Sequence, residues 1–329
     1  MTSGVFLAAA ATSLAASWLL VSRLARVGAR LGLSEALLGM VAALAADAPE
    51  ITTAVAALLR HEHSVGTGVV MGSNVFNLAA LLGLSAVIAG EIGLHRRVIV
   101  LSGTVAVWVA VVSLVVIVGV LSPPLGLLAV AVALLPYLVI LGASRDRLLR
   151  TRLPRAVTRW LAAAVREEER ELEVALHPRR GRGRDAVEAA AATVVVVGAS
   201  VVMERAATRV GSDARVPPIV IGGIVLAAVT SLPNAVSAVY FAAQQRGTAV
   251  LSTALNSNAI NVAAGFLLPA ALLGLGTSSG QEIFVGAFYP ALTAVALVCA
   301  YAAWGLRRGA GVLIIACYLA YLITLVTSA

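Results

Sequence analysis

The sequence is short of charge and contains no lysine. Charged residues make up 12% of its 329 residues and hydrophobic residues 60%, whereas soluble domains carry roughly 25% charge. The mean hydropathy is +0.97. This composition excludes an ordinary soluble domain and indicates a polytopic membrane protein. All 24 basic residues are arginines, and half of them lie between residues 144 and 187. The basic excess therefore describes one loop rather than a surface for nucleic acid.

Several chemical motifs are also missing. The two cysteines, Cys299 and Cys317, lie in apolar runs and are expected to be free thiols. No G-x-x-x-x-G-K-[ST] phosphate loop occurs, so ATP is not implied. No histidine accompanies a serine in mid-span, and the two mid-span acids share one helix, which leaves neither a Ser/His pair nor an acid dyad. We expect no enzyme and no cofactor.

Ten apolar segments are long enough to cross a bilayer, which takes about 20 residues. They lie at roughly 4–22, 33–59, 65–90, 98–121, 125–143, 188–205, 216–243, 248–273, 283–305 and 310–327. Five precede the longest polar interval and five follow it. We therefore predict an all-α membrane protein with a first membrane region at 1–143, a cytoplasmic arginine-rich loop at 144–187 and a second membrane region at 188–329.

The arginines also predict the orientation, because arginine in short loops tends to stay in the cytoplasm. If the 144–187 loop is inside, twenty arginines are cytoplasmic and four are external. The N- and C-termini are then external, and the second half enters the cell membrane from the opposite side. We expect two inverted five-helix repeats. Within the loop, the charged stretch at 165–176 is interpreted as a solvated linker, with a helix beside the membrane or a regulatory contact as alternatives.

The two halves share a motif at a constant offset of 184 residues. Two hydrophobic units interrupted by proline, in corresponding halves of a membrane protein, point to the substrate site of a transporter. The matched pairs are Gly39 with Gly223, Pro49 with Pro233, Glu50 with Asn234, Ser73 with Ser257, Asn74 with Asn258 and Asn77 with Asn261.

Only two acids, Asp47 and Glu50, fall in mid-span. Each costs about 2.5–3.5 kcal/mol if it faces lipid at the bilayer centre. No arginine or histidine lies in mid-span to neutralise them, so a transported cation is the simplest partner. Glu204 is expected at the membrane interface, and His61 and His63 in a solvated external turn.

Neighbouring residues offer the oxygen ligands that hard cations prefer. Pro49 and Pro233 obstruct helical bonds and should free the carbonyls around Ala45 and Val229. Serine and asparagine at i and i+4 stack their oxygens on one helix face. These pairs are Ser73 with Asn77 and Ser257 with Asn261, and Asn74, Asn256 and Asn258 lie on the same turns. Taken singly, such a proline is often only a kink, and such a polar residue only interhelical glue.

At these residues the sequence resembles the calcium/cation antiporter superfamily, the sodium/calcium exchangers and their prokaryotic relatives. Their repeats read G-T-S-x-P-E on one helix and G-S-N-x-x-N on the next. The corresponding stretches here are AADAPE at 45–50 with GSNVFN at 72–77, and VTSLPN at 229–234 with NSNAIN at 256–261. The similarity extends over the ten-helix plan.

The resemblance implies a set of cation ligands, with Glu50 as the main calcium ligand of the first repeat. The others implied are Asp47, Thr230, Ser231, Ser73, Asn77, Ser257, Asn261 and the backbone carbonyls of Ala43 and Ala227. Two departures change the charge pattern: Asn234 stands where the family has an acid, and Asp47 stands where it has a serine, beside Ala46 in place of a threonine. We infer that the second carboxylate has moved, which keeps two negative charges to balance one Ca2+.

The sequence therefore predicts a secondary active antiporter that exchanges Ca2+ for Na+ or H+ by alternating access. The ions are its substrates, the lipid bilayer is its surroundings, and we expect a monomer. A passive cation channel and a transport-impaired family member remain as alternatives, the latter because of Asn234.

Overall fold

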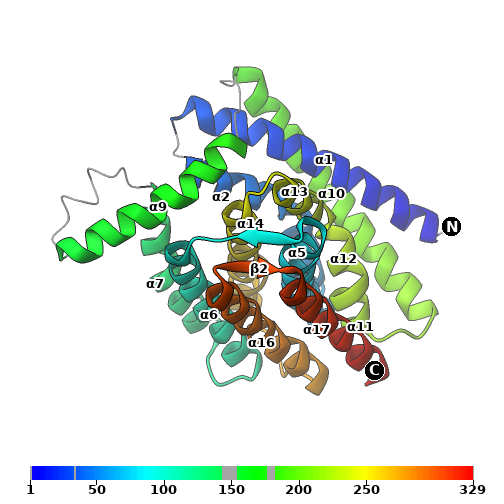
Figure 1. The fold of residues 1–329 in the computed structure, drawn as a ribbon. Helices are drawn as coiled ribbons and strands as arrows, with labels where there is room; N and C mark the ends of the chain where they lie inside the picture. Colours follow the sequence, from blue (N-terminus) through cyan, green and yellow to red (C-terminus); the bar gives the residue numbers. More distant parts are fainter. Residues whose placement is uncertain (1, 33–34, 143–153, 176–181, 329) are drawn as a thin grey trace.

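The computed structural model describes residues 2–32, 35–142, 154–175 and 182–328. Apart from one short two-stranded ribbon, the regular elements in these ranges are helices (Figure 1), which confirms the all-α expectation. In chain order they are α1 (Thr2–Arg30), α2 (Glu35–Ala46), α3 (Ala48–Leu59), α4 (His63–Asn77), η1 (Leu78–Leu84), α5 (Ser85–Ala89), β1 (Glu91–Gly93), α6 (Arg96–Ile117), α7 (Pro123–Gly142), α9 (Arg155–Ala175), α10 (Gly183–Asp213), α11 (Pro218–Val220), η2 (Ile221–Leu226), α12 (Ala227–Thr230), α13 (Leu232–Ala243), α14 (Gly247–Ile260), η3 (Asn261–Leu267), α15 (Leu268–Leu273), α16 (Gly280–Ala303), β2 (Gly305–Arg307) and α17 (Arg308–Thr327).

Long apolar helices dominate the described residues. Eight of these helices are long and apolar enough to cross a membrane, and a ninth span is formed if the pair Pro218–Thr230 and Leu232–Ala243 counts as one. That pair bends by 48° at Ser231. The residues expected as the second span form α2 and α3, which meet at Asp47. Both breaks precede a proline, Pro49 or Pro233, as the sequence predicted.

Two continuous helical stretches, α4–η1–α5 and α14–η3–α15, form the centre of the bundle, and most of their residues are buried. In the first stretch the bonding changes from α- to π-helical directly after Asn77. In the second it changes at Asn261, the equivalent repeat position. Such π-helical segments frequently occur at functional sites. The long helices α1 and α10 pack side by side at the edge of the bundle (Figure 1).

The central helix α4 lies unusually close to η2. A Cβ atom added to Gly72 would come within 2.3 Å of the Gly223 carbonyl oxygen and 2.6 Å of its Cα atom. Only a glycine at position 72 allows this approach, because backbone atoms, unlike a flexible side chain, cannot move aside cheaply. The close packing places Ser73 next to the second half of the chain.

One end of the bundle carries the ribbon and α9. Strands β1 and β2 pair antiparallel with Glu91 opposite Arg307 and Gly93 opposite Gly305, and Arg97 at the start of α6 forms an ion pair of 2.5 Å with Glu167 on α9. We refer to this end as the α9 end. The opposite end, where the chain turns between α3 and α4 at His61, is called the His61 end.

The charged stretch near residue 165 is not the solvated linker that the sequence suggested. Residues 155–175 form α9, which packs against α2, α6, α7 and α14. Buried positions recur every three or four residues at Thr158, Leu161, Val165 and Glu168, which is the pattern of an amphipathic helix with one face against a core. The expectations for residues 143–153 and 176–181 lie outside the described residues.

Candidate cation site

The helix break at Asp47 exposes a backbone carbonyl to a neighbouring helix. Pro49 has no N–H to give to the Ala45 carbonyl, and the Ser17 hydroxyl of α1 donates to that oxygen at 3.2 Å instead. The same hydroxyl lies 3.4 Å from the Ala46 carbonyl oxygen. The freed carbonyl expected at Ala45 is therefore present, and it is satisfied by protein, as backbone at membrane depth must be.

Both mid-span acids point into the second half of the chain. Asp47 Oδ1 accepts hydrogen bonds from the Asn234 amide at 2.7 Å and the Ser257 hydroxyl at 2.6 Å. The Glu50 carboxylate accepts bonds from the Ser231 hydroxyl and the Asn261 amide. Asp47 and Glu50 are both 0% exposed. The fold thus joins two sequence segments almost 200 residues apart into one polar cluster.

The partners of these acids are neutral. Among the described residues, no arginine or histidine forms an ion pair with Asp47 or Glu50. Hydroxyl and amide donors reduce the cost of burying a carboxylate but do not cancel its charge. Two buried carboxylates therefore share a site that a cation would complete.

Four further oxygens of this cluster have no hydrogen-bond partner. All four are buried, and all can act as acceptors toward a cation. They are Asp47 Oδ2, Ser73 Oγ, Asn77 Oδ1 and Asn261 Oδ1. Buried polar atoms are nearly always bonded in folded proteins, so their concentration here needs an explanation. Carboxylate, amide and hydroxyl oxygens are the ligands that Ca2+ takes in proteins.

Asparagines on α4 and α14 tie the two halves together around the acids. The Asn74 amide donates to the Asn258 carbonyl oxygen at 3.3 Å, and the Asn258 amide donates to the Asn74 carbonyl oxygen at 3.1 Å. Asn77 donates to Asn258 Oδ1 at 3.0 Å and to the Ser257 hydroxyl at 3.2 Å. These bonds fix the helix faces that carry the unpartnered oxygens.

Three positions implied as ligands are engaged with their own helices. The Thr230 hydroxyl donates to the Leu226 carbonyl oxygen at 2.9 Å. The carbonyl oxygens of Ala43 and Ala227 accept from the backbone N–H groups of Asp47 at 2.9 Å and Ser231 at 3.2 Å. A carbonyl oxygen has two lone pairs, so each keeps one free for a cation. The Thr230 hydroxyl would have to rotate to reach the cluster.

Two polar residues that contact this region were missed in the sequence. Ser17 of α1 bonds to the broken helix as described above. Tyr137 of α7 donates to Asn256 Oδ1 at 3.0 Å, and its hydroxyl lies 3.2 Å from that of Ser102. The available signal was a serine or tyrosine hydroxyl inside an otherwise apolar span, which by itself is too common to single out.

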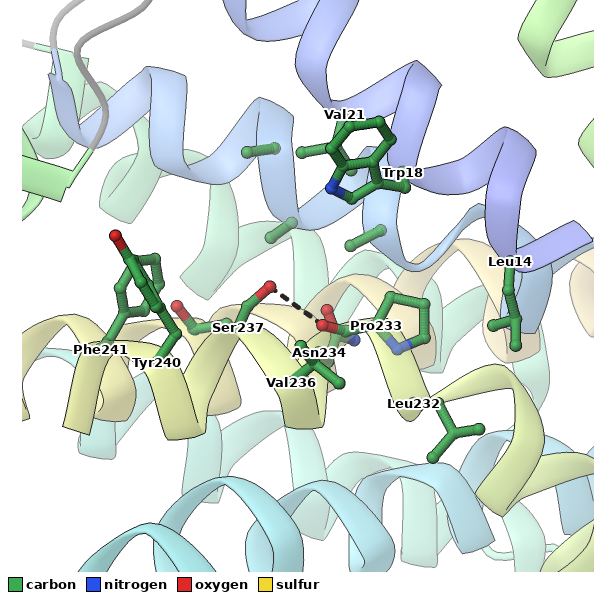
Figure 2. Close-up of a pocket in the computed structure, with 14 residues that line it drawn as sticks. Leu14, Trp18, Val21, Leu232, Pro233, Asn234, Val236, Ser237, Tyr240 and Phe241 are labelled. Atoms are coloured by element: carbon green, nitrogen blue, oxygen red, sulfur yellow. Dashed lines mark hydrogen bonds between the residues drawn. The ribbon is translucent and has the colours of Figure 1, made fainter. Parts of the chain in front are cut away.

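A cavity of about 650 Å³ reaches the cluster from the side of α1. Figure 2 shows Leu14, Trp18 and Val21 on α1 facing α13, where Pro233 and Asn234 begin the helix. The walls are mainly apolar, and the site residues among the lining are Ala43 and Asn234. A cavity of about 900 Å³ lies at the His61 end beside Glu62 and Glu282, and its lining contains none of the implied ligands.

Glu204, which the sequence predicts at the membrane interface, is buried within the protein near one end of the bundle. Its side chain is 0% exposed and forms an ion pair with Arg60, which directly follows α3. The Thr208 hydroxyl also donates to Glu204 at 3.1 Å. The pair links α10 to the α3–α4 turn at the His61 end. His61 is exposed, as expected, but His63 is half-buried.

Comparisons with known proteins identify the family and the fold. A family model described as sodium/calcium exchanger protein matches residues 2–145 and 187–327. The curated protein CaxA of Alkalimonas amylolytica is 34% identical over 77 residues, which are 23% of this chain and 24% of CaxA. The chain thus aligns with about a quarter of that relative's length.

Two solved structures share the fold. The H+/Ca2+ exchanger CAX aligns over 98% of this chain and 82% of its own, with a TM-score of 0.71 and 14% identity. The sodium-calcium exchanger NCX_Mj, soaked without Na+ and Ca2+, aligns over 98% of both chains with a TM-score of 0.61 and 18% identity. Because the family model covers most of the sequence, the chain belongs to the sodium/calcium exchanger family of membrane antiporters.

Proposed function

We propose that this protein exchanges Ca2+ for Na+ or H+ across a cell membrane by alternating access. Asp47 and Glu50 would supply the charge of the Ca2+ site, and amide and hydroxyl oxygens from both halves would complete it. The implied ligands are Glu50, Asp47, Asn77, Ser73, Asn234, Asn261, Ser257, Ser231, Thr230 and the carbonyls of Ala43 and Ala227.

The observation that carries this proposal is the group of four unpartnered buried oxygens beside two carboxylates without a basic partner. Two negative charges balance one Ca2+, and the oxygens come from three separate helical segments, as a hard cation with six to eight ligands requires. A lone proline kink or interhelical hydrogen bond would not leave oxygens unsatisfied at this density.

Exchange follows from competition for the same carboxylates. Ca2+ neutralises Asp47 and Glu50 when bound, and Na+ or H+ neutralises them when Ca2+ leaves. An empty site would keep two charges at membrane depth, at a cost of about 2.5–3.5 kcal/mol each on insertion scales. Return of the site without any cation is therefore disfavoured, and this couples the two fluxes.

We further propose that α1 and α10 move as a pair against the core. They pack along each other, and the Ser13 and Ser200 hydroxyls lie 2.8 Å apart between them. Among the described residues, few polar links join the pair to the core. Ser17 donates to the Ala45 and Ala46 carbonyls near the site, and at the His61 end Glu204 pairs with Arg60 and Thr208 donates to Glu62. The mainly apolar cavity between α1 and α13 leaves room for such a movement.

The proposed topology is ten spans in two inverted repeats, with α9 in the cytoplasm and both termini outside. The reciprocal Asn74–Asn258 bonds, which join residues at the repeat offset of 184, support related halves. The arginine distribution supports the orientation. We expect the transport unit to be a monomer, since the proposed site is assembled within one chain.

Flux into proteoliposomes tests the proposal. Purified protein should take up Ca2+ only when an outward Na+ or H+ gradient is imposed, and the gradient that drives uptake identifies the counter-ion. Uptake should saturate and disappear in Glu50→Gln. Uptake that needs no counter-gradient would indicate a channel. Ca2+ binding without uptake under either gradient would indicate a transport-impaired protein.

A further inference from the structure

A third acid lies buried near the proposed site, on a helix outside the membrane-spanning set. Glu168 of α9 is 1% exposed, and neither of its carboxyl oxygens has a hydrogen bond of regular geometry. An ionised carboxylate in such a position is strongly disfavoured unless it is paired. The proposed exchange mechanism does not use this residue.

Among the residues that the structure describes, no positively charged group pairs with Glu168. From α14 it faces Ser252, and from α7 it is close enough to the Tyr137 hydroxyl to interact with it electrostatically. On α6, Arg97 is engaged by Glu167 at 2.5 Å. On α9 itself, Glu169 adds a like charge, and Arg166 bonds back to the Ala162 carbonyl oxygen at 3.3 Å. The described side chains of α2, at residues 41–46, are all apolar, and α14 contains no ionisable residue.

Glu168 is connected to the cation site by buried groups. Tyr137, its neighbour on α7, donates to Asn256, which directly precedes Ser257 of the proposed site. On the same face of α9, Ala162 and Val165 pack in one apolar cluster with Ala43 and Ile260. Docking of α9 therefore covers the α9 end of the helices that carry the cluster.

A proton fits this position better than a metal ion. Ca2+ takes six to eight oxygens and Mg2+ demands near-octahedral geometry, whereas one carboxyl group with a nearby serine and tyrosine offers too few. Among the described residues no group of three or more His, Cys, Asp or Glu side chains could hold a metal. A protonated carboxyl needs no counter-charge and can donate to a neighbouring hydroxyl oxygen.

We propose that Glu168 is a proton-binding residue that controls the docking of α9. With its proton, the carboxyl is neutral and α9 stays seated over Tyr137 and Asn256. Without it, the charge must reach water, so α9 lifts and uncovers the end of α14, the helix that carries Ser257. The link between docking and ion exchange rests on the function proposed above, whereas the docking itself does not.

Burial raises the pKa of Glu168 from 4.5 to about 7, with Glu169 adding to the rise and Ser252 partly opposing it. Between pH 4.5 and about pH 7, Glu168 therefore keeps its proton in the docked state and has lost it in the undocked state. Docking is strongest below pH 4.5, weakens as pH rises toward 7, and is constant above it. A difference of about 2.5 pKa units corresponds to about 300-fold in the docking equilibrium as an upper bound.

Thiol labelling of purified protein in detergent tests this docking without any transport measurement. Cys299 and Cys317 are replaced by alanine, and Val165, 4% exposed in the apolar cluster, is replaced by cysteine. The labelling rate with a charged maleimide is divided by that of a Val157→Cys protein, because Val157 is 43% exposed on the same helix. This ratio removes the intrinsic pH dependence of the thiol reaction.

The corrected labelling rate should rise at least about tenfold between pH 5 and pH 8. Glu168→Gln should stay near the low-pH rate throughout, whereas Glu169→Gln, which removes the adjacent charge, should keep the rise. Ser252→Ala should move the transition to higher pH, because the hydroxyl favours the charged form. A flat ratio in the parent protein, or an unchanged rise in Glu168→Gln, would overturn the proposal. Neither result would bear on the proposed function, which gradient-driven Ca2+ uptake tests separately.

Discussion

The side-chain amide of Asn234 donates to Asp47 Oδ1 at 2.7 Å, and this contact has a counterpart in the other half of the site. Asp47 and Ser231 occupy equivalent repeat positions, as do Glu50 and Asn234. The counterpart is therefore the contact between Ser231 and Glu50. Each contact joins the two repeats and contains one carboxylate. The family motif that the sequence resembles has the acid of this contact at the position of Asn234. Here the acid is at the other position, Asp47.

Moving this carboxylate back across the contact should preserve Ca2+ binding. Asp47→Asn alone should weaken binding at least about 30-fold, because removing one charged partner from a buried site costs about 2–5 kcal/mol. The double variant Asp47→Ser with Asn234→Asp should regain most of the affinity, because two carboxylates are present again. Isothermal titration of the purified variants with Ca2+ measures the difference.

Asp213→Asn is the matched control for this pair, because Asp213 is exposed at the end of α10 and its replacement removes the same charge. It should bind Ca2+ like the parent protein. If the double variant binds no better than Asp47→Asn, position 47 cannot be exchanged with position 234, and the idea of a displaced carboxylate is wrong.

The close approach of α4 and η2 predicts a sharp effect of one methyl group. Gly72→Ala would place a Cβ atom 2.3 Å from the Gly223 carbonyl oxygen, so the backbone must shift. Overpacking of this kind costs typically about 1–3 kcal/mol and should also displace the neighbouring Ser73. We expect a lower melting temperature and weaker Ca2+ binding. Gly198→Ala on α10, which has no atom within 4 Å of the added Cβ, should neither lower the melting temperature nor weaken Ca2+ binding.

The Arg60–Glu204 pair predicts a rescue. Arg60→Met leaves the fully buried Glu204 carboxylate without its partner and should destabilise the protein by roughly 3 kcal/mol, the low end for a broken buried pair because Arg60 is partly exposed. Glu204→Gln in the same chain should restore most of the melting temperature. Equal melting temperatures for Arg60→Met and the parent would show that the ion pair contributes no stability.

The sequence was sufficient for the helical breaks and for the pairing of equivalent positions in the two halves. Prolines mark both breaks, and the 184-residue offset pairs Asn74 with Asn258, which bond reciprocally. These features are local or periodic, so they can be recognised from the sequence alone. That Asp47 lies against Asn234 and Ser257 depends on how the halves pack, which the repeat suggested but did not specify.

The burial of Glu168 and Glu204 could not be predicted from the sequence. Glu168 lies in a charge-rich stretch, and Glu204 lies near the end of a predicted span. Acids in such places normally face water. Their burial depends on α9 folding back over α7 and α14, and on α10 lying against the α3–α4 turn. Such contacts between distant segments leave no periodic signature, because each involves a single side chain.

Equilibrium Ca2+ binding by purified protein, compared with its Glu50→Gln variant, tests the central claim most directly. If the two buried carboxylates form the Ca2+ site, the parent should bind one Ca2+ per chain with saturation, and Glu50→Gln should lose at least about 30-fold in affinity. Equal Ca2+ affinity in the parent and in Glu50→Gln would contradict the account.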